Sequence, residues 1–400
     1  MKPSNQNIME SLRQWIMVAM VLLAADSGFA QTYSVVDLGA FTNSPETVNA
    51  INNAGKLAGM LKINGNYRAV LYGGAWTNLG TLGGTTNTDA LGTFAGIPIV
   101  TQTVNAVNHT HAARGLMEKA LGVDKDAWLP DFATRKFRSN AKKSPQVQTK
   151  DGERTPGKVA IYATCYVNFN EPGIGHDLLA VLAHNDIPYE LVSSEACCGM
   201  PLLEQGNLQG VAAKKEKNMP VLARYARDGY AIIGAIPSCV LMYKHELPLM
   251  FPDDLDVRAV SEAFWDPFEY FMARHRDGLL KTDFNTPLGK VSYHVPCHAR
   301  VQNIGRKTSE TFALVPDTQV TVVERCSGHA GTFGVKKEFH AMAMKIGTPV
   351  FKAMAQPQPD YISSDCQLAG HHIEQGFDEN SLPKTPLAHP LTLLRKAYGL

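Results

Sequence analysis

From residue 158 onward, short apolar runs alternate with longer amphipathic stretches. The apolar runs have the length and composition of buried strands, and the amphipathic stretches have helical spacing. The predicted strands cover 158–164, 189–194, 230–236, 290–296, 319–324 and 360–364. The predicted helices cover 176–185, 208–228 with an interruption at Pro220, 257–275, a short stretch near 306–314, and part of 336–356. Strands that alternate with helices predict an α/β fold with parallel sheets and right-handed crossovers.

This cycle of strands and helices runs twice along the chain. GKVAIYATC (157–165) resembles GKVSYHVPC (289–297), and SSEACCG (193–199) resembles VVERCSG (322–328). AIPSC, which ends at Cys239, likewise corresponds to SSDC, which ends at Cys366. We therefore predict two pseudo-symmetric parallel-sheet βαβ halves, residues 158–280 and 281–400.

The residues before these halves have a different character. Residues 1–30 carry an apolar stretch after Lys2 and Arg13, which predicts a secretory signal, with a buried N-terminal helix as the alternative. Residues 31–93 are rich in Gly, Asn and Thr, with short β-runs between turn signals. Their D-L-G and I-N-N-x-G sequences resemble HAF repeats, so we expect a small β-repeat segment. Residues 94–157 predict a helix at 105–123 and then a polar linker, including the basic run 135–143 as a solvated stretch.

The composition of the chain narrows the range of possible functions. The 400 residues are 44% hydrophobic and 19% charged, which is typical of a globular protein of two or three domains. The formal net charge of +1 gives no electrostatic basis for a nucleic-acid partner. All seven cysteines lie after residue 164, and an odd number argues against a disulfide framework. Thiolates that hold a metal in a reducing compartment fit better.

The cysteines share one position within the repeat, because each follows a predicted strand. The carboxyl ends of parallel strands share one edge of the sheet, where sites form. The first half would gather four thiols there, and the adjacent pair lets one strand end offer two of them: Cys165, Cys197, Cys198 and Cys239. The second half would gather Cys297, Cys326 and Cys366, with Ser327 in the fourth place. Soft sulfur ligands suit iron–sulfur clusters or zinc. Buried core thiols are the alternative, and they leave the repeated position unexplained.

The spacing of a cysteine, a Cys-Cys-Gly and a closing cysteine, twice over, resembles the cysteine-rich CCG family. The flanking sequences ELPLMFPDD, AGTFGVKKE and IGTPVFKAM also match, and the resemblance covers about 94–400. The family includes the iron–sulfur (C) subunit of anaerobic glycerol-3-phosphate dehydrogenase, the iron–sulfur subunit of glycolate oxidase, and the B subunit of heterodisulfide reductase. The resemblance implies an electron-transfer subunit of a membrane-associated, flavin-dependent dehydrogenase complex with a [4Fe-4S] type cluster. Its implied partners are a flavoprotein dehydrogenase subunit and a quinone or membrane-anchor subunit. No catalytic residue is assigned.

Two departures from the family leave alternatives open. Residues 1–164 contain no cysteine, so the family's ferredoxin-like cysteine runs are missing from them. Ser327 replaces a thiol, so His329 or His298 could complete the second site, which could also hold zinc or serve a quinone. The alternative functions are thiol/disulfide chemistry like that of heterodisulfide reductase, and a metal-stabilised scaffold that binds partners. The family implies a peripheral position on the cytoplasmic face of the plasma membrane, whereas the signal-like residues 1–30 favour export.

Overall fold

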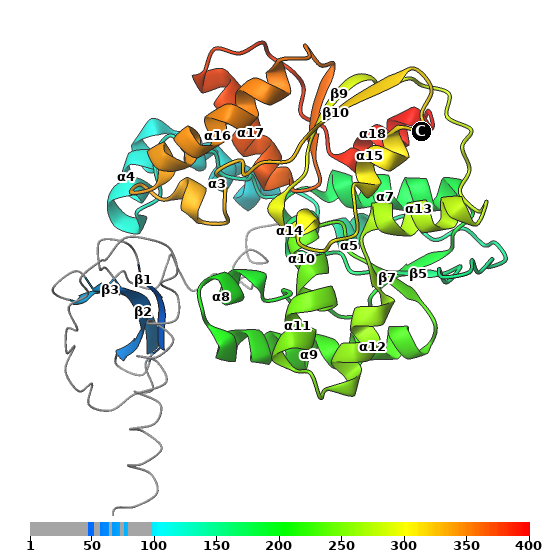
Figure 1. Ribbon diagram of the computed structural model, residues 1–400, viewed down its shortest axis with the longest axis horizontal. Helices are drawn as coiled ribbons and strands as arrows, with labels where there is room; N and C mark the ends of the chain where they lie inside the picture. The colour runs from blue at the N-terminus through cyan, green and yellow to red at the C-terminus, as the bar shows by residue number, and fades with distance from the viewer. Residues whose placement is uncertain (1–46, 52–56, 64–65, 73–75, 79–97) are drawn as a thin grey trace, which may run out of the picture. The chain divides into compact units, whose positions relative to one another are not determined.

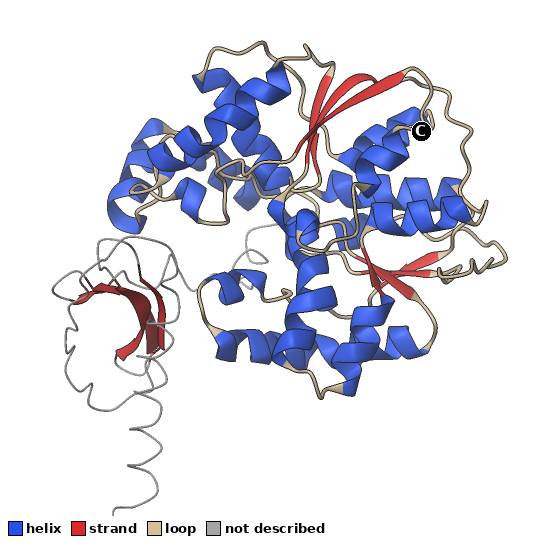
Figure 2. Ribbon diagram, in the orientation of Figure 1, coloured by secondary structure: helices blue, strands red, loops and turns tan. Residues whose placement is uncertain are grey.

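The computed structural model describes residues 47–51, 57–63, 66–72, 76–78 and 98–400, so the signal-like segment 1–30 lies outside the described residues. Within the repeat-like segment, four strands form an antiparallel sheet in the order β1-β2-β3-β4. They are β1 (Thr47–Ile51), β2 (Leu57–Ile63), β3 (Asn66–Tyr72) and β4 (Trp76–Asn78) (Figure 2). The described part of this segment is therefore β-structure, as expected.

A helical segment precedes the first half, and its helix is broken where the sequence predicted a single one at 105–123. The two helices are α3 (Pro98–Asn108) and α4 (His111–Leu121). The break follows from Thr110, whose hydroxyl accepts a hydrogen bond from the backbone N–H of Ala113 at 3.3 Å and so begins a new helix. A short helix, α5 (Phe137–Asn140), lies farther along, with Phe137 fully buried.

The first half is a parallel sheet with helices around it (Figure 1). Its strands are β5 (Val159–Ile161), β6 (Tyr189–Leu191), β7 (Ala231–Ile233) and β8 (Phe264–Trp265), in the order β6-β5-β7-β8. Its helices are α6 (Cys165–Phe169), α7 (Pro172–His184), α8 (Met200–Glu204), α9 (Leu208–Arg227), α10 (Pro237–Leu241), the π-helix η1 (Met242–Glu246), α11 (Leu247–Met250), α12 (Leu255–Ala263) and α13 (Pro267–Arg276). All strand pairs are parallel, as predicted.

Two helix predictions in this half are wrong. The helix expected at 257–275 stops at Ala263, and Phe264 and Trp265 pair with β7 as the edge strand β8. Asp266 then caps α13 by accepting hydrogen bonds from two backbone N–H groups, and Pro267 occupies its first turn, where its fixed φ is favourable. The interruption expected at Pro220 is absent, because α9 continues through it.

The second half repeats the plan with a smaller sheet. Its strands are β9 (Gly289–His294), β10 (Thr318–Val323) and β11 (Tyr361–Ser364), parallel and in the order β10-β9-β11. Its helices are α14 (Cys297–Arg300), α15 (Lys307–Phe312), the 3-10 turn η2 (Phe333–Val335), α16 (His340–Ala355), α17 (Gln367–Glu379) and α18 (Pro390–Ala397). In each half the first strand, β5 or β9, lies between the next two strands of the chain, so the predicted pseudo-symmetry of two βαβ halves is confirmed.

The C-terminal helix α18 packs on α7 of the first half. Its apolar side chains belong to the hydrophobic core built on β5 and β7, and Leu394 is completely buried there. Thr392 donates a hydrogen bond to Asp177 on α7, and Arg395 forms an ion pair with the same carboxylate at 2.6 Å. The end of the chain thus joins the two halves. Within the described ranges, no helix has both the length and the apolar character needed to cross a bilayer.

Candidate metal centres

The four cysteines of the first half lie together at the carboxyl edge of the sheet. Cys165 begins α6 after β5, Cys239 lies in α10 after β7, and the adjacent pair lies in the loop between β6 and α8. Their side chains form a chain of hydrogen-bonded contacts that runs from Cys165 to Cys197, then to Cys198 and then to Cys239. All four are free thiols, and only Cys165 is more than slightly exposed. The structure therefore brings together the four residues that the repeat had singled out.

The electrostatics of this cluster favour a thiolate at Cys197 over one at Cys165 or Cys198. Hydrogen bonds from Cys165 and Cys198 lower the pKa of Cys197 to about 3, and the backbone N–H of Gly199 lies 3.5 Å from the same sulfur. The pKa values of Cys165 and Cys198 are raised well above the usual range, first because each donates its hydrogen to Cys197 and then because both are buried. Four thiolates at this edge would therefore require positive charge among them, which a metal centre provides.

The donor set of four thiols is of the type that holds iron–sulfur clusters. In the described part of the chain, no group of three or more Cys, His, Asp or Glu side chains is arranged to hold one metal ion. A four-iron cluster takes one thiolate at each iron, so its ligands surround it instead of converging on one atom. A row of four soft, buried sulfurs from three loops suits that arrangement. The roles of these cysteines as ligands remain a prediction.

Asn218 on α9 holds the loop that carries the cysteine pair. Its side-chain oxygen accepts a hydrogen bond from the backbone N–H of Ala196 at 2.7 Å. Its amide nitrogen donates to the carbonyls of Ala196 and Cys197 at 3.3 and 3.2 Å. Tyr162 donates to the Ala196 carbonyl at 2.5 Å from the sheet side. The backbone around both thiols is therefore fixed from two elements, and the sequence analysis did not identify either residue.

The basic run 135–143 is not a solvated linker. Phe137 is fully buried, and Arg138 donates a hydrogen bond to the carbonyl of Val192 at 2.6 Å, just beyond β6. Arg138 also lies 3.5 Å from the carboxylate of Glu195, which accepts a hydrogen bond from the backbone N–H of Ala163 at 2.9 Å. Burial raises the pKa of Glu195 to about 7, although Arg138 opposes the rise. This segment therefore braces the loop before the cysteine pair.

The three cysteines of the second half also meet at a sheet edge, in a more open setting. Cys297 begins α14, Cys326 lies in the loop after β10, and Cys366 caps α17. Cys297 and Cys326 are exposed and hydrogen-bonded to each other, and Arg300 lies 3.9 Å from the sulfur of Cys297. Burial raises the pKa of Cys366 to about 11, and the nearby Cys297 adds to the rise.

The two halves share one turn at the cysteine pair. Gly199 and Gly328 both have positive φ, at +95° and +87°. In each case the glycine N–H points back to the sulfur two residues earlier, at 3.5 Å for Cys197 and 3.4 Å for Cys326. A left-handed backbone of this kind favours glycine. The pseudo-symmetry therefore extends to the hydrogen bond that stabilises one sulfur in each half.

The histidines predicted for the second site lie in different surroundings. His298, the residue after Cys297, lies 3.8 Å from the carboxylate of Glu204 on α8 of the first half. His329 follows the turn at Gly328, and its Nε2 atom is buried without a hydrogen-bond partner among the described residues. Burial lowers the pKa of His298, and it lowers that of His329 to about 3.

The cysteine-bearing edges of the two halves adjoin each other. Helices α10 and α14, which carry Cys239 and Cys297, contact one another (Figure 1). Gln302 is buried just after α14 and donates a hydrogen bond to the carbonyl of Pro237 at 3.2 Å. A second link joins His371 on α17 to Glu171 of the first half at 3.2 Å. The two candidate centres thus belong to one region of the molecule.

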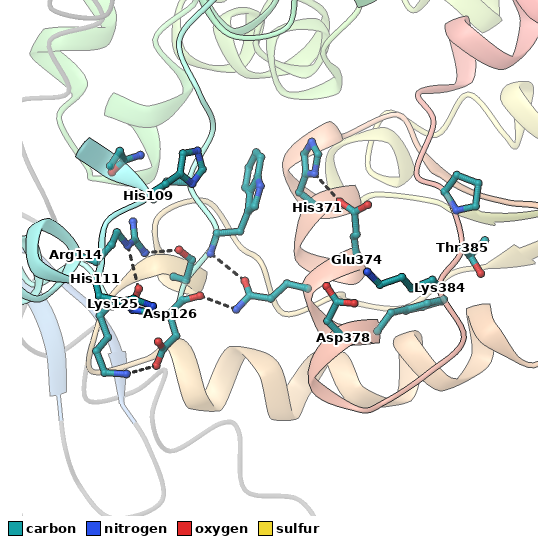
Figure 3. A pocket seen from close by; sticks show the side chains of 17 residues that line it. His109, His111, Arg114, Lys125, Asp126, His371, Glu374, Asp378, Lys384 and Thr385 are labelled. Atoms are coloured by element: carbon teal, nitrogen blue, oxygen red, sulfur yellow. Dashed lines mark hydrogen bonds and ion pairs between the residues drawn. The ribbon is translucent and has the colours of Figure 1, made fainter. Parts of the chain in front are cut away.

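A pocket of about 630 Å³ borders α17 on the side of the helical segment. Figure 3 shows His371, Glu374 and Asp378 along one wall, and His109, Arg114 and Lys125 along the other. The ring of Trp128 stacks on His371 with centroids 3.9 Å apart. Most of the charged side chains that line the pocket are paired with other groups of the protein. Arg114, for example, donates its hydrogen bonds to backbone carbonyls.

The matches to known proteins cover the two parts of the chain that carry the cysteine pattern. Residues 159–244 and 291–374 each match the model of the cysteine-rich domain CCG. The C subunit of the anaerobic glycerol-3-phosphate dehydrogenase of Escherichia coli (strain K12) is 27% identical over 300 residues, which cover 74% of this chain and 72% of that protein.

Two other relatives share smaller parts of the chain. The B subunit of the fumarate reductase (CoM/CoB) of Methanothermobacter marburgensis is 25% identical over 253 residues, covering 62% of this chain and 48% of the relative. Lactate utilization protein A of Bacillus cereus (strain B4264) is 27% identical over 211 residues, covering 51% of this chain and 82% of the relative. Two of these three relatives are named as subunits of a dehydrogenase or a reductase.

Proposed function

We propose that this chain, which carries two copies of the cysteine-rich CCG domain as its repeated cysteine pattern predicted, is the iron–sulfur electron-transfer subunit of a membrane-associated, flavin-dependent dehydrogenase complex. Subunits of dehydrogenase and reductase complexes among its relatives support an iron–sulfur cofactor and an electron-transfer role. The finer assignment is a complex of the glycerol-3-phosphate or glycolate type that passes electrons toward quinone. Its partners would be a flavoprotein dehydrogenase subunit and a quinone or membrane-anchor subunit.

The observation that carries the proposal is the row of four thiols at the edge of the first sheet. Cys165, Cys197, Cys198 and Cys239 would hold a [4Fe-4S] type cluster, which accepts and releases one electron at a time. Burial of three of these thiols keeps water away from the sulfurs. The N–H of Gly199 supplies a hydrogen bond to Cys197, and such hydrogen bonds to sulfur are among the features that set a cluster's reduction potential.

In this proposal, the cellular location of the subunit follows from the chemistry of its cysteines. All seven cysteines are free, as expected of a protein that works in a reducing compartment. We therefore place the subunit peripherally on the cytoplasmic face of the plasma membrane. The alternative, export directed by the signal-like residues 1–30, would expose Cys297 and Cys326 to oxidation.

The decisive experiment compares Cys198→Ala with the unsubstituted chain, both purified without oxygen. We expect Cys198→Ala to lose about four irons and four sulfides per chain, with their visible absorbance, because the first site would lack one of four ligands. Cys326→Ala is the matched control, since it removes a thiol of the other half and should leave the first-site iron in place. Equal iron and absorbance in Cys198→Ala and the unsubstituted chain would refute the first-site assignment.

A second candidate function has one observation in its favour. Cys297 and Cys326 are exposed, and Arg300 lies 3.9 Å from the sulfur of Cys297, so a sulfur-containing anion could reach these thiols. Thiol/disulfide chemistry like that of heterodisulfide reductase would use such access. Turnover of a heterodisulfide by the iron-loaded chain would favour this function over simple electron transfer. A chain that binds no metal would instead indicate a scaffold that binds partners.

A further inference from the structure

The second half lacks a thiol where the first half has Cys198. Ser327 occupies this place and is buried, with only 5% of its surface exposed. The turn lies directly against α16, since a Cβ atom on Gly328 would come within 2.1 Å of the carbonyl oxygen of Ala343. A Cβ on Gly347 would come within 2.3 Å of the carbonyl oxygen of Ser327. This close packing leaves the loop no room to move, so the side chains that flank Ser327 are held in fixed places.

Two imidazoles flank this turn, one from the loop and one from α17. The rings of His329 and His372 have centroids 5.8 Å apart, at an interplanar angle of 57°. In both residues Nε2 is buried and finds no hydrogen-bond partner in the described part of the chain. His372 is only 4% exposed, and its ring is hydrogen-bonded to the backbone of Ala343 and Ser327. These contacts fix the orientation of the ring.

Unpaired buried nitrogens are unusual and costly. Leaving such an atom without a partner costs about 1–3 kcal/mol, so native proteins pair nearly all of them with protein, water or an ion. Four other histidines of the second half follow this rule. His294, His340, His371 and His389 each have hydrogen bonds or close polar contacts at both ring nitrogens. In the described part of the chain, the buried histidine nitrogens without a partner belong to His329 and His372, beside the missing thiol, and to His245 of the first half.

Imidazole is also the chemically suitable substitute. Histidine replaces cysteine in some iron–sulfur centres, and metal-binding histidines typically fix one ring nitrogen on a backbone carbonyl while the other binds the metal. The backbone contacts of the His372 ring and its unpartnered Nε2 are compatible with this arrangement.

We propose that the His329–His372 pair supplies imidazole nitrogen to the metal centre formed by Cys297, Cys326 and Cys366, in place of the thiolate that Ser327 lacks. This inference rests on the proposed function, because it assumes that the chain binds iron–sulfur clusters. It also selects between the two histidines that the sequence suggested, since His298 instead faces the carboxylate of Glu204.

The test uses the full chain carrying Cys198→Ala, so that the remaining iron belongs to the second centre. Iron per chain and pulsed EPR of the reduced protein are measured, and histidine labelled with ¹⁵N identifies any imidazole coupling without altering the site. We expect a nitrogen coupling that changes with the label. The paired substitution His329→Gln and His372→Gln should abolish it and reduce the second-centre iron at least twofold. His298→Gln, the matched control, should change neither quantity.

Several outcomes would overturn the inference. They are a second half that binds no iron, a coupling insensitive to the histidine label, iron that stays unchanged in the paired variant, and loss of the coupling with His298→Gln. Circular dichroism of the paired variant shows whether it is folded, and the labelling result stands without it. Failure of the proposed function is distinguishable, because the chain with Cys198 intact would then lack iron at the first site as well.

Discussion

At the scale of single residues, one amide fixes the cysteine pair. Asn218 is buried and makes three hydrogen bonds to the backbone of Ala196 and Cys197. The orientation of two sulfurs therefore depends on a side chain from a different element, 22 residues beyond Ala196 in the chain.

Replacing Asn218 by Ala should destabilise the protein and loosen the first site. We expect the free energy of unfolding to fall by about 1–3 kcal/mol, because buried N–H and carbonyl groups lose their partners. Urea unfolding measures the change, and iron retention reports on the site. Asn140→Ala, which removes two exposed side-chain hydrogen bonds, to Lys136 and Ser139, is the control and should change stability by less than about 0.5 kcal/mol. Equal effects of the two substitutions would contradict the role given to Asn218.

The cysteines could be predicted from the sequence, but their supports could not. Each cysteine follows an apolar run, and the rule that parallel strands end at one edge is local enough to apply without coordinates. Asn218 and Arg138 carry no such local signal. Arg138 reaches Val192 across 54 residues, and the polar run around it has the composition of a linker. Only tertiary packing assigns these contacts.

At the scale of elements, close backbone approach sets the second site. The loop after β10 meets α16 through Gly328 and Gly347, where side chains of any size would collide with backbone atoms. The sequence contained Gly328 within the cysteine motif, but it gave no sign of Gly347 as the facing surface.

Gly328→Ala should therefore be strongly destabilising. The new Cβ would approach the carbonyl oxygen of Ala343 to 2.1 Å, and φ of +87° is unfavourable for alanine. We expect a loss of about 3 kcal/mol or more. Gly173→Ala is the matched control, since it lies in α7 with open space around it, and there the change should be neutral or stabilising by about 0.5–1 kcal/mol. Thermal unfolding of both variants measures the contrast, and a small effect of Gly328→Ala would show that the loop can move away from α16.

The periodicity of apolar residues predicted regular strands and helices, but it did not predict where a helix is interrupted. The six predicted strands of the two halves are present, and the edge strand β8 is an addition. Helices α7, α9, α15 and α16 lie where the apolar pattern predicts them, whereas α17 and α18 were not predicted. The helix expected at 257–275 failed because the pair Phe264 and Trp265 fits both a helix face and a short edge strand. The Asp-Pro step that follows was the available signal for a new helix start.

At the scale of the whole molecule, the halves are joined by α18 on α7 and by a charged contact near the candidate centres. His371 on α17 lies between two carboxylates, Glu171 of the first half at 3.2 Å and Glu374 at 3.0 Å. Trp128 covers its ring, and Gln367 lies 3.4 Å from its Nε2. Burial opposes the charge of this imidazole, but the two glutamates outweigh it and raise its pKa to about 9.

This contact makes stability depend on pH in a defined direction. An unfolded histidine has a pKa of about 6.5, so between pH 6.5 and 9 the folded state binds the extra proton and the unfolded state does not. The stabilisation is therefore complete below pH 6.5 and is lost as pH rises through about 9. We expect the free energy of unfolding to fall by at most about 3 kcal/mol over this window, less whatever the partly exposed glutamates lose to solvent screening.

Glu171→Gln should reduce this fall in the free energy of unfolding, because it removes one of the two carboxylates. His109→Gln, which alters an exposed pair with Asp131, is the control. Urea unfolding at a series of pH values measures how the free energy of unfolding depends on pH. An identical pH dependence in Glu171→Gln and the unsubstituted chain would show that this contact does not couple the halves.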